Sequence, residues 1–207
     1  MKLDVNSTRM ELLRLRKRVV LARRGHKLLK DKQDELLRQL MDLVKLVTDL
    51  RKTVEKLLQE TSQRFLLARA TMDPESVEQA MLVPSKKLSV AVKKRNLMGV
   101  RVPVFEETVS GKIHCYGFAA TSGELDASLV SLDKVIPELL SLAEKEKTLF
   151  MLATEVDKTR RRVNALEYIL IPNLDETIRH ITMKLSEMER GDLVRLMRVK
   201  EILRQKS

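Results

Sequence analysis

An apolar seven-residue repeat in the first third of the chain restricts its fold more than any other feature. Counted from Leu12, apolar residues recur at two positions of each heptad as far as Thr71. No proline occurs before Pro74, and Gly25 is the one glycine in that stretch. Such a repeat is typical of a helix packed on another helix in a left-handed supercoil. We therefore predict one continuous helix over residues 9–72, about 95 Å long.

The two positions of the repeat form an apolar seam along this helix. At its start, Thr8 and Glu11 have the spacing of a capping box. His26 and Gln33 are polar seam residues near Gly25, which indicates that something other than the partner helix packs there. The first set of seam residues is Leu12, Val19, His26, Gln33, Leu40, Val47, Val54, Thr61 and Ala68, and the second is Leu15, Ala22, Leu29, Leu36, Leu43, Leu50, Leu57, Arg64 and Thr71.

A helical period returns at Glu124 and predicts a second long helix over residues 124–207. Pro137 and Pro172 lie inside it and are expected to kink it, because proline lacks the backbone donor. Between 157 and 167 the register slips, which indicates a local stutter. Its expected seam is Leu129, Ile136, Ala143, Phe150, Ile171, Ile178, Leu185 and Val199, with Leu132, Leu139, Ala153, Leu174, Ile181, Met188 and Ile202, and at the slip the stripe moves to Val156, Val163, Leu166 and Leu170.

The segment 73–123 has a different pattern. A short helix is expected after Asp73-Pro74, and the Val-rich, alternating stretch 88–107 predicts a strand. Ser110-Gly111 is a turn signal, and residues 112–118 are predicted to form another short strand. The predicted fold is mainly α: a long antiparallel two-helix coiled coil with a small middle segment containing a β-hairpin, divided at 1–72, 73–123 and 124–207. Two parallel chains in a dimer also fit the periodicity.

Charge is concentrated near the N-terminus. The net charge is +11, and residues 1–32 hold eleven Lys and Arg against three acids. A basic end favours an anionic partner such as nucleic acid, lipid headgroups or an acidic protein surface, although a solvated helix face is an equally simple interpretation. Nucleic-acid binding has weaker support, because aromatic residues for base stacking are only 3% of the chain.

Catalytic and cofactor motifs are missing from the sequence. It contains no Gly-rich phosphate loop, and His114-Cys115 is too small a set for a zinc site. Glu106-Glu107 is interpreted as a solvated carboxylate pair, and Cys115, the single cysteine, as a small apolar strand residue. There is no apolar run of about 18 residues and no signal-peptide core. We expect no catalytic site, no cofactor, no metal and no membrane insertion.

Three stretches resemble one known family. They are TRRRVNALEYILIPNLDETI (159–178), STRMELLRLRKRVVLARRGHKLLKDKQDEL (7–36) and the central VAVKKRNLMGVRVP. They are similar to the D subunit of the V-type and A-type rotary ATPases, in its prokaryotic form. The resemblance implies a non-catalytic central axle at the cytoplasmic face of the membrane, which couples ATP hydrolysis or synthesis to H⁺ or Na⁺ transport. The alternative left open is a basic coiled-coil protein that binds nucleic acid or acts as a scaffold.

The resemblance also implies partners. The two long helices would enter the ring of alternating A and B subunits, the middle portion would bind the F subunit, and the lower end would meet the funnel subunit (C/d type) on the membrane ring. No nucleic acid is expected. Candidate contacts with the catalytic ring are Arg14, Arg16, Lys17, Arg18, Arg23, Arg24, Arg160, Arg161 and Arg162, and candidate contacts with the F subunit are Val90, Val92, Val100, Val102 and Val104.

Overall fold

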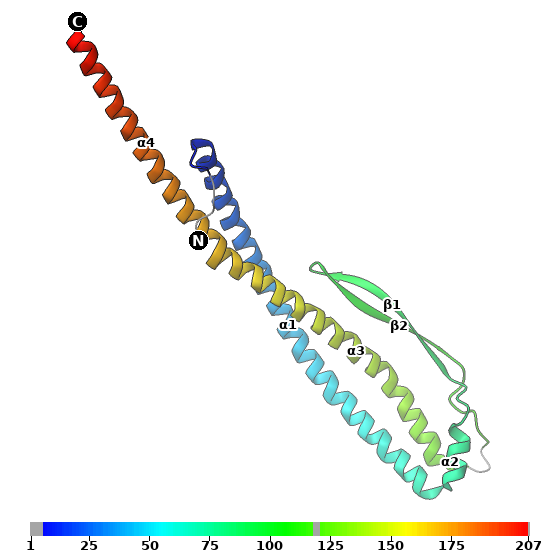
Figure 1. Ribbon diagram of the computed structural model, residues 1–207. Coiled ribbons are helices and arrows are strands. Elements are labelled where there is room, and N and C mark those ends of the chain that lie inside the picture. Colours follow the sequence, from blue (N-terminus) through cyan, green and yellow to red (C-terminus); the bar gives the residue numbers. More distant parts are fainter. Residues whose placement is uncertain (1–5, 118–120, 207) are drawn as a thin grey trace. The chain divides into compact units, whose positions relative to one another are not determined.

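The computed structural model describes residues 6–117 and 121–206, without the side chains of 205 and 206. Two long helical stretches flank a short helix and a two-stranded antiparallel sheet (Figure 1). The predicted mainly-α fold with a central hairpin is confirmed. The elements are α1 (Arg9–Thr71), α2 (Pro74–Met81), β1 (Lys87–Leu97), β2 (Val100–Ser110), α3 (Gly123–Asn164), the π-helical segment η1 (Ala165–Leu170) and α4 (Ile171–Lys206).

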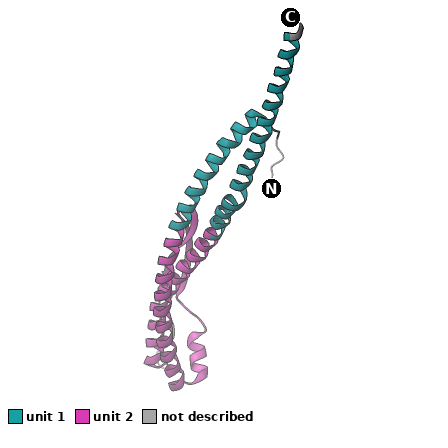
Figure 2. Cartoon of the chain, turned by 90° about the vertical axis from the view of Figure 1, so that its left-hand side faces the viewer, with its two compact units in different colours: residues 1–35, 157–207 teal, residues 36–156 magenta. Residues whose placement is uncertain are grey.

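The chain forms two compact units, coloured separately in Figure 2. Unit 1 combines residues 1–35 with 157–207, and unit 2 is residues 36–156. Each unit contains a piece of α1 and a piece of the C-terminal helical stretch. The two pieces run antiparallel in both units. In unit 1, Arg9 pairs with Glu189 and the later residue His26 contacts the earlier residue Glu167. In unit 2, Arg51 pairs with Glu146 and the later residue Arg64 donates to the earlier residue Ser131. Antiparallel packing within one chain is therefore what this sequence adopts.

The core of unit 1 is formed by the predicted seam. Leu12, Leu15 and Val19 of α1 are buried against Leu174 and Ile181 of α4. These residues follow each other at spacings of three, four and seven, so they occupy one face of each helix. At the start of α1 the N–H of Glu11 donates to Oγ1 of Thr8 over 3.3 Å, which is the first half of the expected capping box.

The core of unit 2 joins the hairpin to the helix pair. Val100 and Val102 of β2 are buried together with Leu36 of α1 and Leu152 of α3. The outer edge of β2 is fastened as well, because the N–H of Phe105 donates to a carboxylate oxygen of Glu144 over 2.9 Å. A two-stranded hairpin is marginal in water by itself, so these contacts with the helices hold it in place.

The hairpin turn lies at Met98-Gly99, where both residues have positive φ (51° and 87°). Such a two-residue turn matches the right-handed twist of its strands, and glycine adopts it without steric cost. The Asn96 side chain accepts the Gly99 N–H over 2.9 Å. The prediction of a turn at Ser110-Gly111 between two strands is therefore wrong, because the alternating stretch 88–107 already contains both strands of the pair.

Gly111 follows β2, and residues 112–117 form no strand; Phe118, the last residue of the expected strand, lies outside the described residues. The reason for glycine at position 111 is close approach. Its φ is +98°, and a Cβ there would lie 2.2 Å from the carbonyl oxygen of Ser85. The chain therefore leaves the sheet at Ser110-Gly111, close to Ser85, which lies just before the start of β1.

The seam on α3 is displaced by one residue from the predicted one. Phe150 is predicted in the seam but is 64% exposed, whereas Leu152 and Val135 are fully buried. Between residues 171 and 185 the predicted seam is right, since Leu174 and Ile181 are buried, but the predicted seam residues Met188, Val199 and Ile202 are exposed. The register therefore changes between the two stretches, and η1 lies where it changes.

Pro172 lies two residues after the end of η1. A proline ring collides with the carbonyl group four residues earlier in an α-helix and donates no hydrogen bond. Just before it, the N–H of Ile171 bonds to the carbonyl oxygen of Leu166, five residues back, as in a π-helix. Around Pro137, however, α3 continues as an α-helix, so a proline does not by itself require the wider turn.

Candidate functional site

Nearly all the net charge lies in unit 1. Residues 1–35 and 157–207 hold 23 Lys and Arg against 13 Asp and Glu, or +10, whereas residues 36–156 hold 17 against 16, or +1. A helix pair of this charge attracts anionic surfaces over about a Debye length, roughly 8 Å at physiological salt. Unit 1 is therefore the candidate surface for an acidic partner.

The basic side chains predicted on α1 point to solvent. Arg14 pairs with Glu11 one turn earlier at 3.8 Å, and Arg23 pairs with Asp175 of α4 at 2.9 Å. Exposed pairs like these stabilise a fold by at most about 1 kcal/mol, so they leave the guanidinium groups available for other partners. The exposed residues are Arg14, Arg16, Lys17, Arg18, Arg23 and Arg24.

Arg160, Arg161 and Arg162 are also exposed, and they lie between two buried residues, Thr159 and Val163. The seam residues hold the inner side of the helix, so the three arginines occupy the remaining sides. Arg161 pairs with Asp157 on the same helix at 2.7 Å. Because this pair is exposed, it does not fix the guanidinium group strongly.

A polar contact lies where the α1 seam becomes polar. Nε2 of His26 lies 3.3 Å from a carboxylate oxygen of Glu167, which belongs to η1. The expectation that something other than the partner helix packs near Gly25 is wrong for His26, because its contact is this carboxylate of the C-terminal helical stretch. The sequence analysis does not identify the apolar side chains after Glu167 as surface residues. Leu170 fits the predicted seam, and Tyr168 and Ile169 fit no heptad position, although both lie in the stretch 159–178 that resembles the family.

The five valines predicted to contact the F subunit divide between two faces of the hairpin. Val90 and Val92 are exposed, and Val104 is half-buried. Val100 and Val102 are covered by α1 and α3, so they form core and offer no surface. Successive residues of a strand point to opposite faces of the sheet. Val100 and Val102 lie opposite Leu97 and Arg95 of β1 and share their face. Val90 and Val92 are even-numbered residues of β1 and therefore point to the other face.

An apolar cavity of about 290 Å³ lies in unit 2 between α2, the open end of the hairpin and α3. Lys86 and Asp133 form an ion pair at its wall. Cys115 also lines the cavity and is an exposed free thiol. The apolar lining residues include Met81, Leu88, Val109, Ile113, Leu132 and Ile136, which explains why α3 carries apolar residues on a second face, away from α1.

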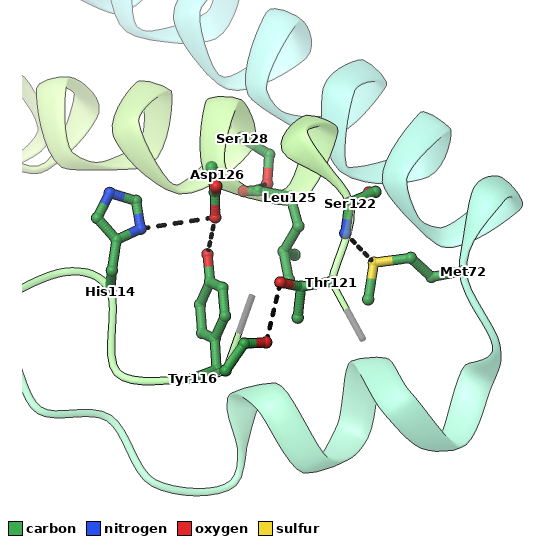
Figure 3. A network of polar contacts seen from close by, with 9 residues as sticks. Met72, His114, Tyr116, Thr121, Ser122, Leu125, Asp126 and Ser128 are labelled. Carbon is green, nitrogen blue, oxygen red and sulfur yellow. Dashed lines mark hydrogen bonds and ion pairs between the residues drawn. The ribbon is translucent and has the colours of Figure 1, made fainter. Parts of the chain in front are cut away.

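A small polar network fastens the segment beside the cavity to α3 (Figure 3). The Tyr116 hydroxyl donates to the Asp126 carboxylate over 2.5 Å, and Nδ1 of His114 lies 3.6 Å from the same oxygen. Burial, followed by the hydrogen bond to Asp126, raises the pKa of Tyr116. The network anchors this loop to α3.

Membrane-spanning and metal-binding features are absent from the described residues, 6–117 and 121–206. None of the helices in these ranges combines the length and hydropathy needed to cross a bilayer. Within the same residues no three His, Cys, Asp or Glu side chains are grouped as metal ligands.

Comparison with known proteins identifies the family. The family model for the ATP synthase D subunit matches residues 11–201. A V-type ATP synthase D subunit of Acetivibrio thermocellus is 53% identical over 96% of this chain and 91% of its own length. A protein of the same name from Clostridium botulinum strain Langeland is 52% identical over 100% of this chain and 98% of its own. One from Clostridium novyi is 51% identical over 98% and 96%. The resemblance noted in the sequence is confirmed, and the chain belongs to the family of ATP synthase D subunits.

Proposed function

We propose that this chain is the central rotor component of a V-type ATP synthase. Unit 1 would enter the ring of alternating A and B subunits and carry torque between that catalytic ring and the ion-translocating ring in the membrane. The chain itself would catalyse nothing, and rotation would couple ATP hydrolysis or synthesis to transport of H⁺ or Na⁺. The observation that carries the proposal is an antiparallel helix pair with a net charge of +10 in a member of the D-subunit family.

The residue types suit an axle. An axle must turn inside its ring without being trapped at one angle, so each contact should be weak and reversible. Exposed Lys and Arg side chains make such contacts, each worth about 0–1 kcal/mol. The helix pair also needs stiffness, and seam packing such as that of Leu15 against Leu174 and Ile181 supplies it. The charged outer surface would therefore provide weak contacts with the ring, and the apolar seam would provide stiffness.

Unit 2 is proposed to bind the other partners. Its exposed hairpin residues Val90 and Val92 are the remaining candidates for contact with the F subunit. The end of the unit formed by α2 and the start of α3 would meet the funnel subunit. The complex would then lie at the cytoplasmic face of the membrane, with this chain as a peripheral part of it. The three-part division of the chain at residues 72 and 123 belongs to the same proposal.

The proposal is tested by mixing the purified chain with purified A and B subunits at about 0.1 M salt and separating the products by size. We expect one chain per ring. We also expect the ring complex to dissociate as salt is raised, because screening weakens exposed ion pairs. A ring that excludes the chain at every salt concentration would contradict the rotor function.

The charge of unit 1 keeps one alternative open, a coiled-coil protein that binds nucleic acid. Neutralising several phosphates would make the affinity for duplex DNA fall steeply, by about 10³-fold or more between 50 and 200 mM salt. Fluorescence anisotropy with labelled duplex DNA measures this directly. Tight binding with such a slope, together with exclusion from the ring, would favour the alternative.

A further inference from the structure

The π-helical segment η1 exposes apolar side chains in the middle of the basic unit. None of its residues is buried. Tyr168 is 71% exposed and Ile169 is 61% exposed, and Leu170 beside them is also exposed. Neighbouring exposed apolar side chains often belong to a binding surface, and the same chain also exposes Leu66 and Leu67 and the run Met81 to Val83.

The segment contains one residue more than the seam requires. On its N-terminal side the inward residues Thr159, Val163 and Leu166 follow each other at spacings of four and three. On its C-terminal side the same alternation holds for Ile171, Leu174, Ile178 and Ile181. Between Leu166 and Ile171 the spacing is five. A π turn holds about one residue more than an α turn, so it takes up this insertion and keeps both seams on one face.

The insertion does not serve the packing of the two helices. Removing one residue between Leu166 and Ile171 would restore the spacing of four and leave a continuous heptad pattern. Isolated π turns in α-helices are uncommon and often occur at functional sites. What the extra residue adds is outward-facing surface: the segment contributes Tyr168, Ile169 and Leu170 to the exposed side, and Glu167 is held at one edge by His26.

Charges next to the segment indicate the chemistry of its partner. Arg161 and Arg162 are exposed about two helical turns before Tyr168 and Ile169. Acids lie nearby as well: Asp157 pairs with Arg161 and Asp175 with Arg23, and Glu167 contacts His26. The excess positive charge beside the segment comes from the exposed lysines and arginines of α1. Since unit 1 carries +10, a complementary surface is acidic around an apolar recess.

We propose that η1 is a docking site for the catalytic ring, in which Tyr168 and Ile169 enter an apolar recess bordered by carboxylates that meet Arg161 and Arg162. The inference rests on the proposed rotor function, and it adds the segment of unit 1 that binds the ring most tightly. Exposed aromatic anchors beside arginines are the residue types that carry most of the binding energy in protein interfaces. The basic side chains elsewhere on unit 1 would supply the weaker, sliding contacts.

The contact is tested with a Tyr168→Ser, Ile169→Ser double variant of the full chain, using immobilised A/B ring and measuring the dissociation constant. We expect binding at least about tenfold weaker, with an unchanged melting temperature, because both side chains are exposed.

The matched control is Phe150→Ser, which removes an equally exposed ring in unit 2 and should bind as the unchanged chain does. Equal binding by the double variant and the unchanged chain would overturn the docking site alone. Failure of the unchanged chain to bind would overturn the rotor function and this inference with it.

The insertion is tested by deleting Leu170. We expect the shortened chain to melt at the same temperature or higher, because Leu166 and Ile171 regain heptad spacing, and to bind the ring at least about tenfold more weakly. The control is deletion of Val20, an exposed residue of α1, which turns Leu12 and Leu15 away from α4 and should lower the melting temperature. If the Leu170 deletion destabilised the chain as much as the Val20 deletion does, or left ring binding intact, the inference would be wrong.

Discussion

Leu166 and Ile171 are consecutive inward-facing residues of the C-terminal helical stretch, although five positions separate them, and every residue between them is exposed. A heptad allows at most four positions between neighbouring seam residues. The π turn that spans them therefore changes the register by one residue. The seam residues on α3 are displaced by one from the positions that a single register, extended backward from α4, assigns to them.

The one-residue change of register makes a direct prediction for stability. Leu152 is fully buried in the core of unit 2, whereas Phe150, two residues earlier, is 64% exposed. Leu152→Ala should lower the free energy of unfolding by about 2–5 kcal/mol, because it leaves a cavity. Phe150→Ala should change it by about 0.5 kcal/mol or less. Urea titrations of both variants measure these losses. A larger loss of unfolding free energy for Phe150→Ala than for Leu152→Ala would support the register predicted from the sequence.

Two glycines are expected to respond oppositely to the same substitution. Gly111→Ala should destabilise the fold by about 1–3 kcal/mol, since the new Cβ meets the Ser85 carbonyl and φ is positive. Gly25→Ala should stabilise α1 by about 0.5–1 kcal/mol, because a Cβ there meets nothing within 4 Å and glycine is a poor helix former. Thermal melts of the two variants test this; a Gly111→Ala chain as stable as the unchanged one would contradict the close approach.

The three consecutive arginines are predicted to act in binding and not in folding. Replacing Arg160, Arg161 and Arg162 by Ala should leave the melting temperature unchanged, because all three side chains are exposed. Docking to the A/B ring should weaken by roughly 10-fold or more at low salt, since up to about 1 kcal/mol is lost for each contact. A matched control replaces the three consecutive basic residues of the hairpin, Lys93, Lys94 and Arg95, which belong to unit 2. Equal effects of the two triple variants on ring binding would argue against a specific role for the arginines.

The tyrosine network predicts a pH dependence. The pKa of Tyr116 is raised in the folded chain above its ordinary value of 10.0, by burial and then by the hydrogen bond to Asp126. The unfolded chain therefore loses this proton first as the pH rises. The stabilising contribution is complete below about pH 10 and disappears above it. In urea titrations above about pH 10, the free energy of unfolding should fall less steeply for Tyr116→Phe than for the unchanged chain. Parallel curves for both chains in that range would show that the tyrosine contributes nothing there.

Local pattern is enough to predict part of this structure. The predicted α1 seam is right because 63 residues follow one register without an interruption, so residues as distant as Leu15 and Ala68 are both buried. The exposure of the arginines follows from the same reasoning. Each of these predictions depends only on the spacing of residues along one helix.

The rest depends on contacts that spacing does not report. The sequence predicts a register slip at 157–167, but no turn residue marks the π turn at Ala165–Leu170. Phe150 is apolar although it faces solvent. Val100 and Val102 resemble surface residues in the sequence because their cover comes from α1 and α3, which are distant along the chain. The turn at Met98-Gly99 lies inside a continuous alternating run, so the alternation does not reveal it. Ser110-Gly111 matches a turn pattern more clearly, but glycine is needed there because the backbone passes close to Ser85.

The most direct measurement of the central claim is single-molecule rotation. Cys115 is the single cysteine of the chain, is exposed and lies in unit 2, so it can carry a biotin and a bead while the A/B ring is fixed to glass. The rotor account predicts that adding ATP makes the bead turn in one direction, and that rotation stops in the Tyr168→Ser, Ile169→Ser variant under light load. A labelled complex that hydrolyses ATP while the bead shows only undirected motion would contradict it.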